Sequence, residues 1–420
     1  MIFASFSHLL LALIVAISIL LMLIRPRNIL EVYWVGGGAI LLVALRLIPL
    51  KLAGKAAAEG SDVYLFLIGM MLLSELAREH GVFDWLSSAA LKGAHGSSAR
   101  LFTLVYGVGT LVTVFMSNDA TAVVLTPAIL AAIRKAKVAP VPYLMACAMI
   151  ANAASFVLPI SNPANLVIYG NHMPPLLQWL PRYALPSVVS IVATYLALRW
   201  MQRHSLLQKI EADVTLPPLT GAGKTAALGI AATALILLTA SALDIQLGLP
   251  TAIAGCATAG IVLIRERKSP WATLRGVSWG VLPMVAGLFV LVEALDKSGL
   301  IRMIGASLHD AAERSIVWTI WGVGVVLALA CNLMNNLPTG LIGGSAVHSA
   351  QVPEQVTSAI LIGVDLGPNL SVTGSLATIL WLMALRREGQ NVTAWTFLKL
   401  GALVMPPALL LALATLFLLH

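Results

Sequence analysis

Two polar clusters interrupt apolar segments of the chain, and their side chains could hold a proton, a cation or a small polar molecule. The first is Ser117-Asn118-Asp119, and the second, 218 residues later, is Asn335-Asn336. Carboxamides and hydroxyls donate and accept hydrogen bonds, whereas a carboxylate accepts them and can take up a proton. An ionised carboxylate is costly in an apolar medium. We therefore expect Asp119 to bind and release a coupling ion, with capping of the following helix as the structural alternative.

A second break follows each cluster. The first contains Ser161-Asn162, and the second begins at Asp365 and continues to Gly374-Ser375. Asp365 aligns with Asn152 of the first half, so it is the second candidate for ion coupling, with a helix-packing hydrogen bond as the alternative. Irregular backbone survives at membrane depth only where it faces protein or a watery cavity. The predicted solute-binding residues are Ser117, Asn118, Ser161, Asn162, Asn335, Asn336, Gly374 and Ser375.

The elements that must position these residues are membrane helices. The chain has 420 residues, of which 59% are hydrophobic and 10% charged, whereas a soluble protein has about 25% charged residues. A net charge of +8 then indicates basic loops on the cytoplasmic side and not a nucleic-acid partner. The three cysteines have neither metal-site nor disulfide spacing. The sequence predicts an all-α polytopic membrane protein without catalytic residues, metal or cofactor.

The two clusters belong to a long internal repeat. Gly69, Leu73, Glu75 and Gly81 align with residues 218 positions later, at Gly287, Leu291, Glu293 and Gly299. Each half contains three spanning helices, a polar connector, an apolar segment with a polar centre, an interrupted helix and a last helix. The predicted parts are 1–205 (scaffold 1–99, hairpin and broken helix 100–170), a cytoplasmic linker 206–224, and 225–420 (scaffold 225–314, hairpin and broken helix 315–386).

The segment 100–134 is the reason to expect an inverted second half. At about 1.5 Å per residue it is too long for one crossing of about 30 Å, and its centre has no charged loop. We interpret it, and 315–347, as re-entrant hairpins, so that each half crosses about five times. An odd number of crossings inverts the second half, and paired interruptions in such repeats indicate a transporter's binding site. The basic loops place both termini outside the cytoplasm.

At these motifs the chain resembles the bacterial arsenite efflux permeases (the ArsB family) of the ion transporter superfamily. The similar stretches are residues 118–127, 334–339, 362–368 and 374–378, together with Ser161-Asn162 and Asn165. The resemblance implies export of As(III) and Sb(III) as As(OH)₃ and Sb(OH)₃, in exchange for protons, across the bacterial inner membrane. It also implies that a soluble arsenite-stimulated ATPase can act as a partner.

The ring of carboxamides and hydroxyls suits a neutral trihydroxide, and no arginine lies near any break. That absence argues against a dicarboxylate or phosphate. The alternatives are a sodium/proton antiporter, a cation-coupled dicarboxylate or citrate carrier, and a membrane subunit that only anchors an ATPase.

Overall fold

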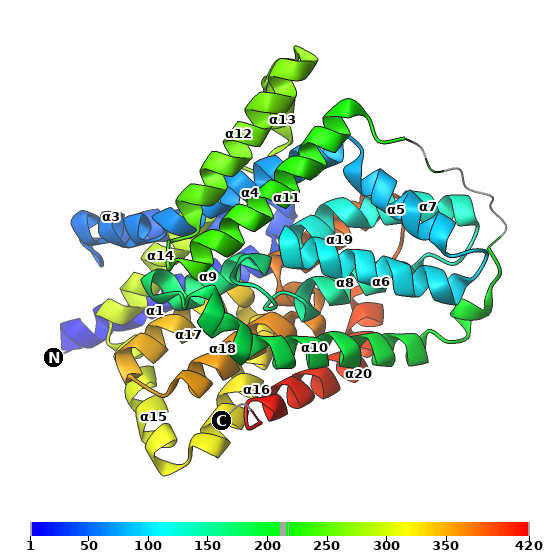
Figure 1. Ribbon diagram of the computed structural model, residues 1–420. Helices are drawn as coiled ribbons and strands as arrows, with labels where there is room; N and C mark the ends of the chain where they lie inside the picture. Colours follow the sequence, from blue (N-terminus) through cyan, green and yellow to red (C-terminus); the bar gives the residue numbers. More distant parts are fainter. Residues whose placement is uncertain (1, 211–215, 217, 419–420) are drawn as a thin grey trace.

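The computed structural model describes residues 2–210, 216 and 218–418, and its regular elements are helices (Figure 1). The first half contains α1 (Ile2–Ile24), α2 (Glu31–Ala44), α3 (Leu50–Glu59), α4 (Ser61–Glu79), α5 (Val82–Gly93), α6 (Ser98–Phe115), α7 (Thr126–Ala136), α8 (Val141–Ala153), α9 (Pro163–Tyr169) and α10 (Leu176–Met201). The second half contains α11 (Gly221–Ala242), α12 (Gly248–Glu266), α13 (Trp271–Gly276), α14 (Val281–Lys297), α15 (Leu300–Arg314), α16 (Ile316–Met334), α17 (Asn336–Ala350), α18 (Glu354–Leu366), α19 (Leu376–Arg387) and α20 (Ala394–Thr415).

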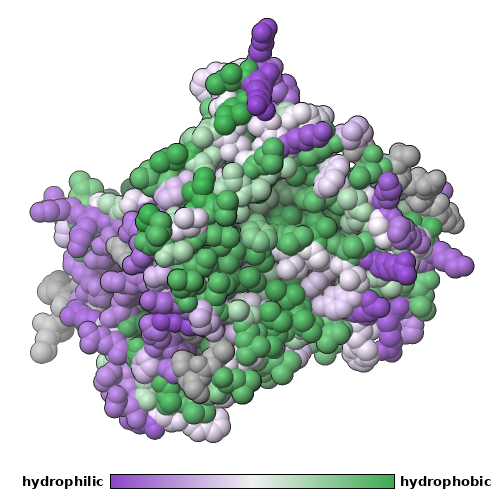
Figure 2. All heavy atoms as spheres, in the orientation of Figure 1, coloured by the Kyte–Doolittle hydropathy of each residue, from purple (hydrophilic) through white to green (hydrophobic). Residues whose placement is uncertain are grey.

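Within the described residues, seven helices are long and apolar enough to cross a membrane, or eight if the bent pair α3 and α4 counts as one span. Figure 2 shows a hydrophobic, green area across the middle of one face, with hydrophilic, purple residues gathered at its left and right edges and at the tip of α12. An apolar surface of this extent suits a lipid environment better than water. The prediction of an all-α polytopic membrane protein is confirmed.

Equivalent residues begin equivalent helices in the two halves. Gly81 and Gly299 precede α5 and α15 with φ of 72° and 85°, a conformation that glycine adopts at little cost. Ser97 and Ser315 precede α6 and α16, and each side chain accepts a hydrogen bond from a backbone N–H of the first turn. These serines satisfy one of the free donors that every helix start carries. The sequence repeat is therefore also a structural repeat.

The two halves interlock reciprocally. Helix α4 packs against α12, and its counterpart α14 packs against α2. Helix α17 of the second hairpin packs against α9, and α19 packs against the first hairpin, while α10 packs against α20. In Figure 1, α5 and α7 lie at the right and α15 and α17 at the left. The two hairpins thus open toward opposite ends of the molecule, which is the arrangement that an inverted repeat requires.

Two short helices were not predicted. The second spanning helix was expected to reach residue 49, but α2 ends at Ala44, and Arg46 has a φ of 55° before Pro49 and α3. Helix α3 is amphipathic and contains Lys51, Lys55 and Glu59, so its composition resembled a loop. The six-residue α13 was hidden for the same reason. The predicted domain boundaries and the orientation in the membrane stay predictions.

Candidate functional site

The tip of the first hairpin is held by Ser117. Helix α6 ends at Phe115, and the chain turns into a π-helix, Ala120–Leu125, before α7 begins. The Ala120 N–H donates to Ser117 Oγ at 3.2 Å. Asp119 makes no side-chain capping bond, and its carboxylate has no hydrogen-bond or ion-pair partner among the described residues. Capping is therefore done by Ser117, and the Asp119 carboxylate stays available for an ion or a solute. A π-helix often marks a functional site.

At the tip of the second hairpin, two adjacent asparagines have different roles. Asn335 has a φ of 76°, its Oδ1 accepts the Leu337 N–H at 3.4 Å, and its Nδ2 donates to the Thr373 carbonyl at 3.4 Å. Asn336 begins α17 and has no side-chain hydrogen-bond partner among the residues that the structure describes. Asn335 thus shapes the turn, and Asn336 is left with free donor and acceptor groups.

In each interrupted helix, the segment after the break begins with a capping side chain, and the two capping residues are equivalent in the repeat. Asn162 precedes α9, and its Oδ1 accepts the Ala164 N–H at 3.0 Å. Ser375, 213 residues later, precedes α19, and its Oγ accepts the Thr378 N–H at 3.1 Å. Asn162 Nδ2 also donates to Asp365 Oδ1 at 2.6 Å. This last bond joins the broken helix of one half to that of the other.

The four breaks converge on one small cavity, which we call the site cavity. Its polar lining residues are Asn118, Asp119, Asn162, Asn336 and Ser375, one or two from each break. Its volume is about 20 Å³, which is about the space that one water needs. Helices α17 and α19 begin here, and the positive ends of their dipoles favour oxygen-rich groups. The site is therefore closed around its polar groups in this conformation.

A second cavity adjoins the first at Asp119, and we call it the connecting cavity. It has a volume of about 100 Å³, and Asp119, Pro163 and Leu376 line both cavities. The connecting cavity extends past Ser117 to Glu75 of α4 and Ser278. Asp119 is thus placed between the site cavity and a path toward the end of α4.

Five predicted site residues do not line the site cavity, and one of them, Ser117, lines only the connecting cavity. Ser161 donates to the Val114 carbonyl at 3.0 Å and accepts from the Leu158 N–H at 3.2 Å. A Cβ at Gly374 would lie 2.4 Å from Pro368 Cα, so this glycine serves close packing. The other two are Asn335 and Asp365. Asp365 is fully buried behind Asn162, so it can orient a lining side chain but does not itself line the cavity.

Three further asparagines, which the sequence reasoning did not single out as site residues, support the site. Asn332 donates to the Ala328 and Gly367 carbonyls at 2.8 and 3.0 Å. Asn152 Nδ2 donates to Asn369 Oδ1 at 2.9 Å, and Asn369 Nδ2 donates to the Met149 carbonyl at 3.0 Å. The available signal was the excess of asparagine in these apolar segments, because each buried carboxamide needs partners.

The relatives of the chain identify its family. The family model for citrate transporters, CitMHS, matches residues 1–364. The chain belongs to this family. Arsenical pump membrane proteins of Yersinia enterocolitica and Escherichia coli K12 are each 27% identical to this CitMHS chain over 361 residues, 83% of the chain and 84% of the relative. An uncharacterized transporter of Mycobacterium tuberculosis is 25% identical over 362 residues, 84% of each chain.

The fold of this CitMHS chain also has a solved counterpart. The YdaH transporter of Alcanivorax borkumensis, described as having an unusual topology, superposes with a TM-score of 0.59 at 16% identity, over 89% of this chain and 88% of its own. The resemblance to the arsenite permeases is confirmed, and the protein is a membrane transporter.

The cavity's chemistry restricts what the transporter can bind. Among the described residues, neither lysine nor arginine lines the site cavity or the connecting cavity. Among the residues that the structure describes, no group of three His, Cys, Asp or Glu side chains could hold a metal ion. Cys331, the thiol nearest in sequence to the second tip, is fully buried, and its Sγ lies 3.6 Å from the Val364 carbonyl. The groups available to a solute are one carboxylate, three carboxamides and one hydroxyl.

Proposed function

We propose that this protein exports As(OH)₃ and Sb(OH)₃ in exchange for protons by alternating access. The observation that carries the proposal is Asp119, a carboxylate without a partner among the described residues, in a cavity otherwise lined by neutral hydrogen-bonding groups. A trihydroxide donates and accepts hydrogen bonds as carboxamides do. A carboxylate can accept bonds from its hydroxyls when ionised and releases the solute when protonated. The arsenical pump relatives support the choice of solute.

The cycle follows from these groups. Asp119 is ionised when the solute enters from the cytoplasm, and Asn118, Asn162, Asn336 and Ser375 orient its hydroxyls. A proton arriving from the opposite side neutralises Asp119 and favours the return of the empty site. We propose that both termini lie outside the cytoplasm of a bacterial inner membrane, and that a soluble ATPase partner is not required for this cycle.

A citrate carrier is the second candidate, because the family model describes citrate transporters. Citrate carries up to three negative charges, and recognition of carboxylates generally uses arginine or lysine. The site cavity and the connecting cavity present neither side chain among the described residues. The repulsion between Asp119 and a carboxylate would act against binding, so we favour the neutral trihydroxide.

The proposal is tested with purified protein in proteoliposomes. An imposed pH gradient should drive arsenite and antimonite movement without any ATPase, and citrate or Na⁺ should not replace them. The D119N variant should lose the response to the gradient. Substrate-stimulated Na⁺ uptake, Na⁺-dependent proton release without arsenite, or transport only after an ATPase is added would each contradict it.

A further inference from the structure

Two glutamates related by the repeat each line a separate cavity. Glu75 of α4 lines the connecting cavity, which also contains Asp119. Glu293, its counterpart on α14, lines a larger cavity of about 520 Å³ bounded by α9 and α17, which we call the vestibule. The vestibule is bounded by the second hairpin and the connecting cavity by the first, and the two hairpins open toward opposite ends of the molecule (Figure 1). The two acids thus occupy equivalent places in the two halves, and the connecting cavity is the one of these two cavities that shares lining residues with the site cavity.

The connecting cavity can carry a proton from Asp119 to Glu75. Its volume of about 100 Å³ exceeds several-fold the 10–15 Å³ or so that one water needs. Ser74, Ser117 and Ser278 line it with hydroxyls, and Glu75 and Asp119 are the titratable groups in its wall. Helix α13 and the residues after it present Gly276, Val277 and Ser278 to this cavity, none of them charged. A chain of waters and hydroxyls can therefore join the two carboxylates.

Glu75 is fixed at the outer end of that chain. The residue is only 7% exposed, and its carboxylate forms an ion pair with Arg78, whose Nε donates to Glu75 Oε2 at 2.9 Å. A Cβ at Gly276 would lie 1.7 Å from Glu75 Oε1. Glycine at position 276 is thus needed for the carboxylate to lie where it does. Arg78 is half exposed. It neither supplies nor accepts a proton at neutral pH, but it holds the Glu75 carboxylate at the outer end of the connecting cavity.

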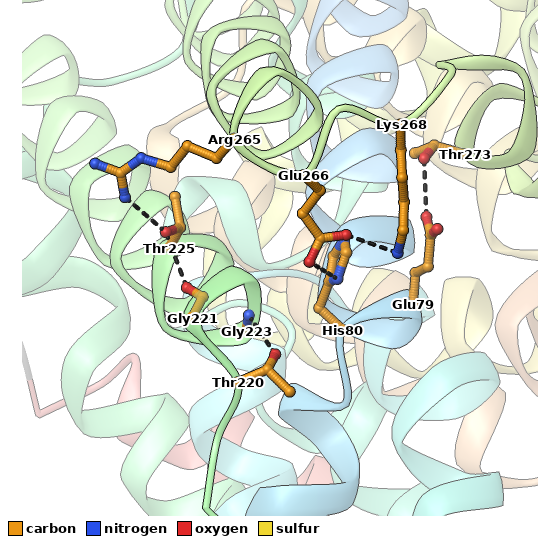
Figure 3. A network of polar contacts seen from close by, with 10 residues as sticks. All are labelled: Glu79, His80, Thr220, Gly221, Gly223, Thr225, Arg265, Glu266, Lys268 and Thr273. Carbon is orange, nitrogen blue, oxygen red and sulfur yellow. Dashed lines mark hydrogen bonds and ion pairs between the residues drawn. The ribbon is translucent and has the colours of Figure 1, made fainter.

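The end of α4 is anchored by further polar contacts, shown in Figure 3. The Thr273 hydroxyl of α13 donates to Glu79 Oε2 at 2.8 Å. His80 Nδ1 lies 3.7 Å from Glu266 Oε1 of α12, and Lys268 Nζ lies 2.6 Å from Glu266 Oε2. These contacts tie α4 to α12 and α13, so that Gly276 stays against Glu75.

Glu293 has more charged neighbours. Lys55 of α3 pairs with Glu59 at 3.9 Å close to the vestibule. The rings of His172 and His348 lie there at a mutual tilt of 38°, with their centroids 4.9 Å apart. Besides Glu293, the titratable and charged side chains of the vestibule wall are Glu59, Tyr169, His172, Asp296, Arg302 and His348. The vestibule therefore offers a proton-collecting surface around Glu293.

From this arrangement we infer that Glu75 relays protons between Asp119 and one side of the membrane, and that Glu293 does so on the opposite side. In each transfer one carboxylic acid releases a proton to a water and another carboxylate accepts it, so nothing else is consumed. The inference rests on the proposed proton coupling. It goes beyond that coupling because it assigns the two routes to named residues and makes these routes separable from solute binding.

Glu75→Gln tests the relay when two transport modes are compared in proteoliposomes. Arsenite/arsenite exchange needs no net proton movement, whereas efflux driven by a pH gradient does. We expect gradient-driven efflux to fall about tenfold, or about 1.4 kcal/mol in barrier, while exchange stays at the wild-type rate. Glu75→Asp should recover part of the efflux. Glu79→Gln is the matched control, because it keeps an oxygen acceptor for the Thr273 hydroxyl and Glu79 lines neither the site cavity nor the connecting cavity.

Two further variants complete the test. Gly276→Ala displaces the Glu75 carboxylate without removing it and should lower gradient-driven efflux as Glu75→Gln does. Glu293→Gln should slow the same mode and spare exchange. An equal loss of both modes in the Glu75 variant would assign Glu75 a structural role, and no loss in either mode would remove it from the path. A wild-type protein whose efflux ignores the pH gradient would instead overturn the proposed coupling itself.

Discussion

At the scale of single residues, the two acids of the breaks have different surroundings. Asp119 lines both the site cavity and the connecting cavity and has no polar partner among the described residues. Asp365 is fully buried and receives the Asn162 Nδ2–H at 2.6 Å. A carboxylate that orients a carboxamide need not titrate for transport to occur. We therefore expect Asp119 to act in coupling and Asp365 to act by positioning Asn162.

The role of Asp365 can be tested with two substitutions, one that removes only its charge and one that also removes its hydrogen-bond acceptor. Asp365→Asn keeps an oxygen for the Asn162 amide, whereas Asp365→Ala leaves that buried donor unsatisfied, which costs about 1–3 kcal/mol. Arsenite affinity should fall about tenfold, or about 1.4 kcal/mol, in the alanine variant and stay near wild type in the asparagine variant. The measurement is isothermal titration of the purified proteins. Equal damage by both substitutions would show that the charge of Asp365 matters.

At the scale of helices, glycines let the backbones of the second hairpin and the broken helices approach closely. A Cβ at Gly363 of α18 would lie 2.4 Å from the Gly324 carbonyl oxygen of α16. A Cβ at Gly344 of α17 would lie 2.4 Å from the Ile168 carbonyl oxygen of α9. Small residues at such contacts are typical of packed membrane helices. The second hairpin and both broken helices therefore form one tightly packed unit around the site.

Gly363→Ala should destabilise that unit. The added methyl group meets backbone and not a side chain that could move away, and overpacking of this kind costs about 1–3 kcal/mol. A lower midpoint in thermal unfolding of the detergent-solubilised protein is the expected result. Gly322→Ala on the same α16 is the control, because a Cβ there meets nothing within 4 Å. Similar midpoints for the two variants would contradict the packing argument.

At the scale of the whole molecule, the sequence predicted the breaks and named all five polar residues that line the site cavity, but it also named five residues that do not line it. Polar residues inside apolar segments and their matched spacing were enough to predict four converging breaks. The choice between Asn335 and Asn336 depends on the left-handed backbone at Asn335, and the place of Glu75 depends on α13 packing against α4. Both arise from tertiary contacts between distant segments. Hydrophobic patterning carries no information about such contacts.

Because the two hairpins open in opposite directions, the two ends of an interrupted helix should face opposite sides of the membrane. Glu354 starts α18 and Glu388 follows α19, so they lie at the two ends of one interrupted helix. Both are exposed and take part in surface ion pairs, with Arg182 and Arg134, which contribute little stability. Single cysteines at these positions, in a background without Cys147, Cys256 and Cys331, should be labelled by an impermeant maleimide from opposite sides.

In the orientation that we propose, Glu354→Cys should react in intact cells and Glu388→Cys only in inverted vesicles. The reverse pattern would invert the molecule but keep the opposed repeats. Reaction of both cysteines from the same side would contradict the inverted arrangement.

The central claim is that the solute and a proton bind alternately at Asp119. The most direct test is whether arsenite binding releases protons. Arsenite added to the purified wild-type protein in weakly buffered detergent, at a pH where Asp119 is partly protonated, should release protons. Arsenite affinity should rise with pH, because ionisation of Asp119 favours the loaded site. The D119N variant should show neither effect. Equal proton release from D119N, or arsenite binding by the wild-type protein without proton release at any pH, would contradict the account.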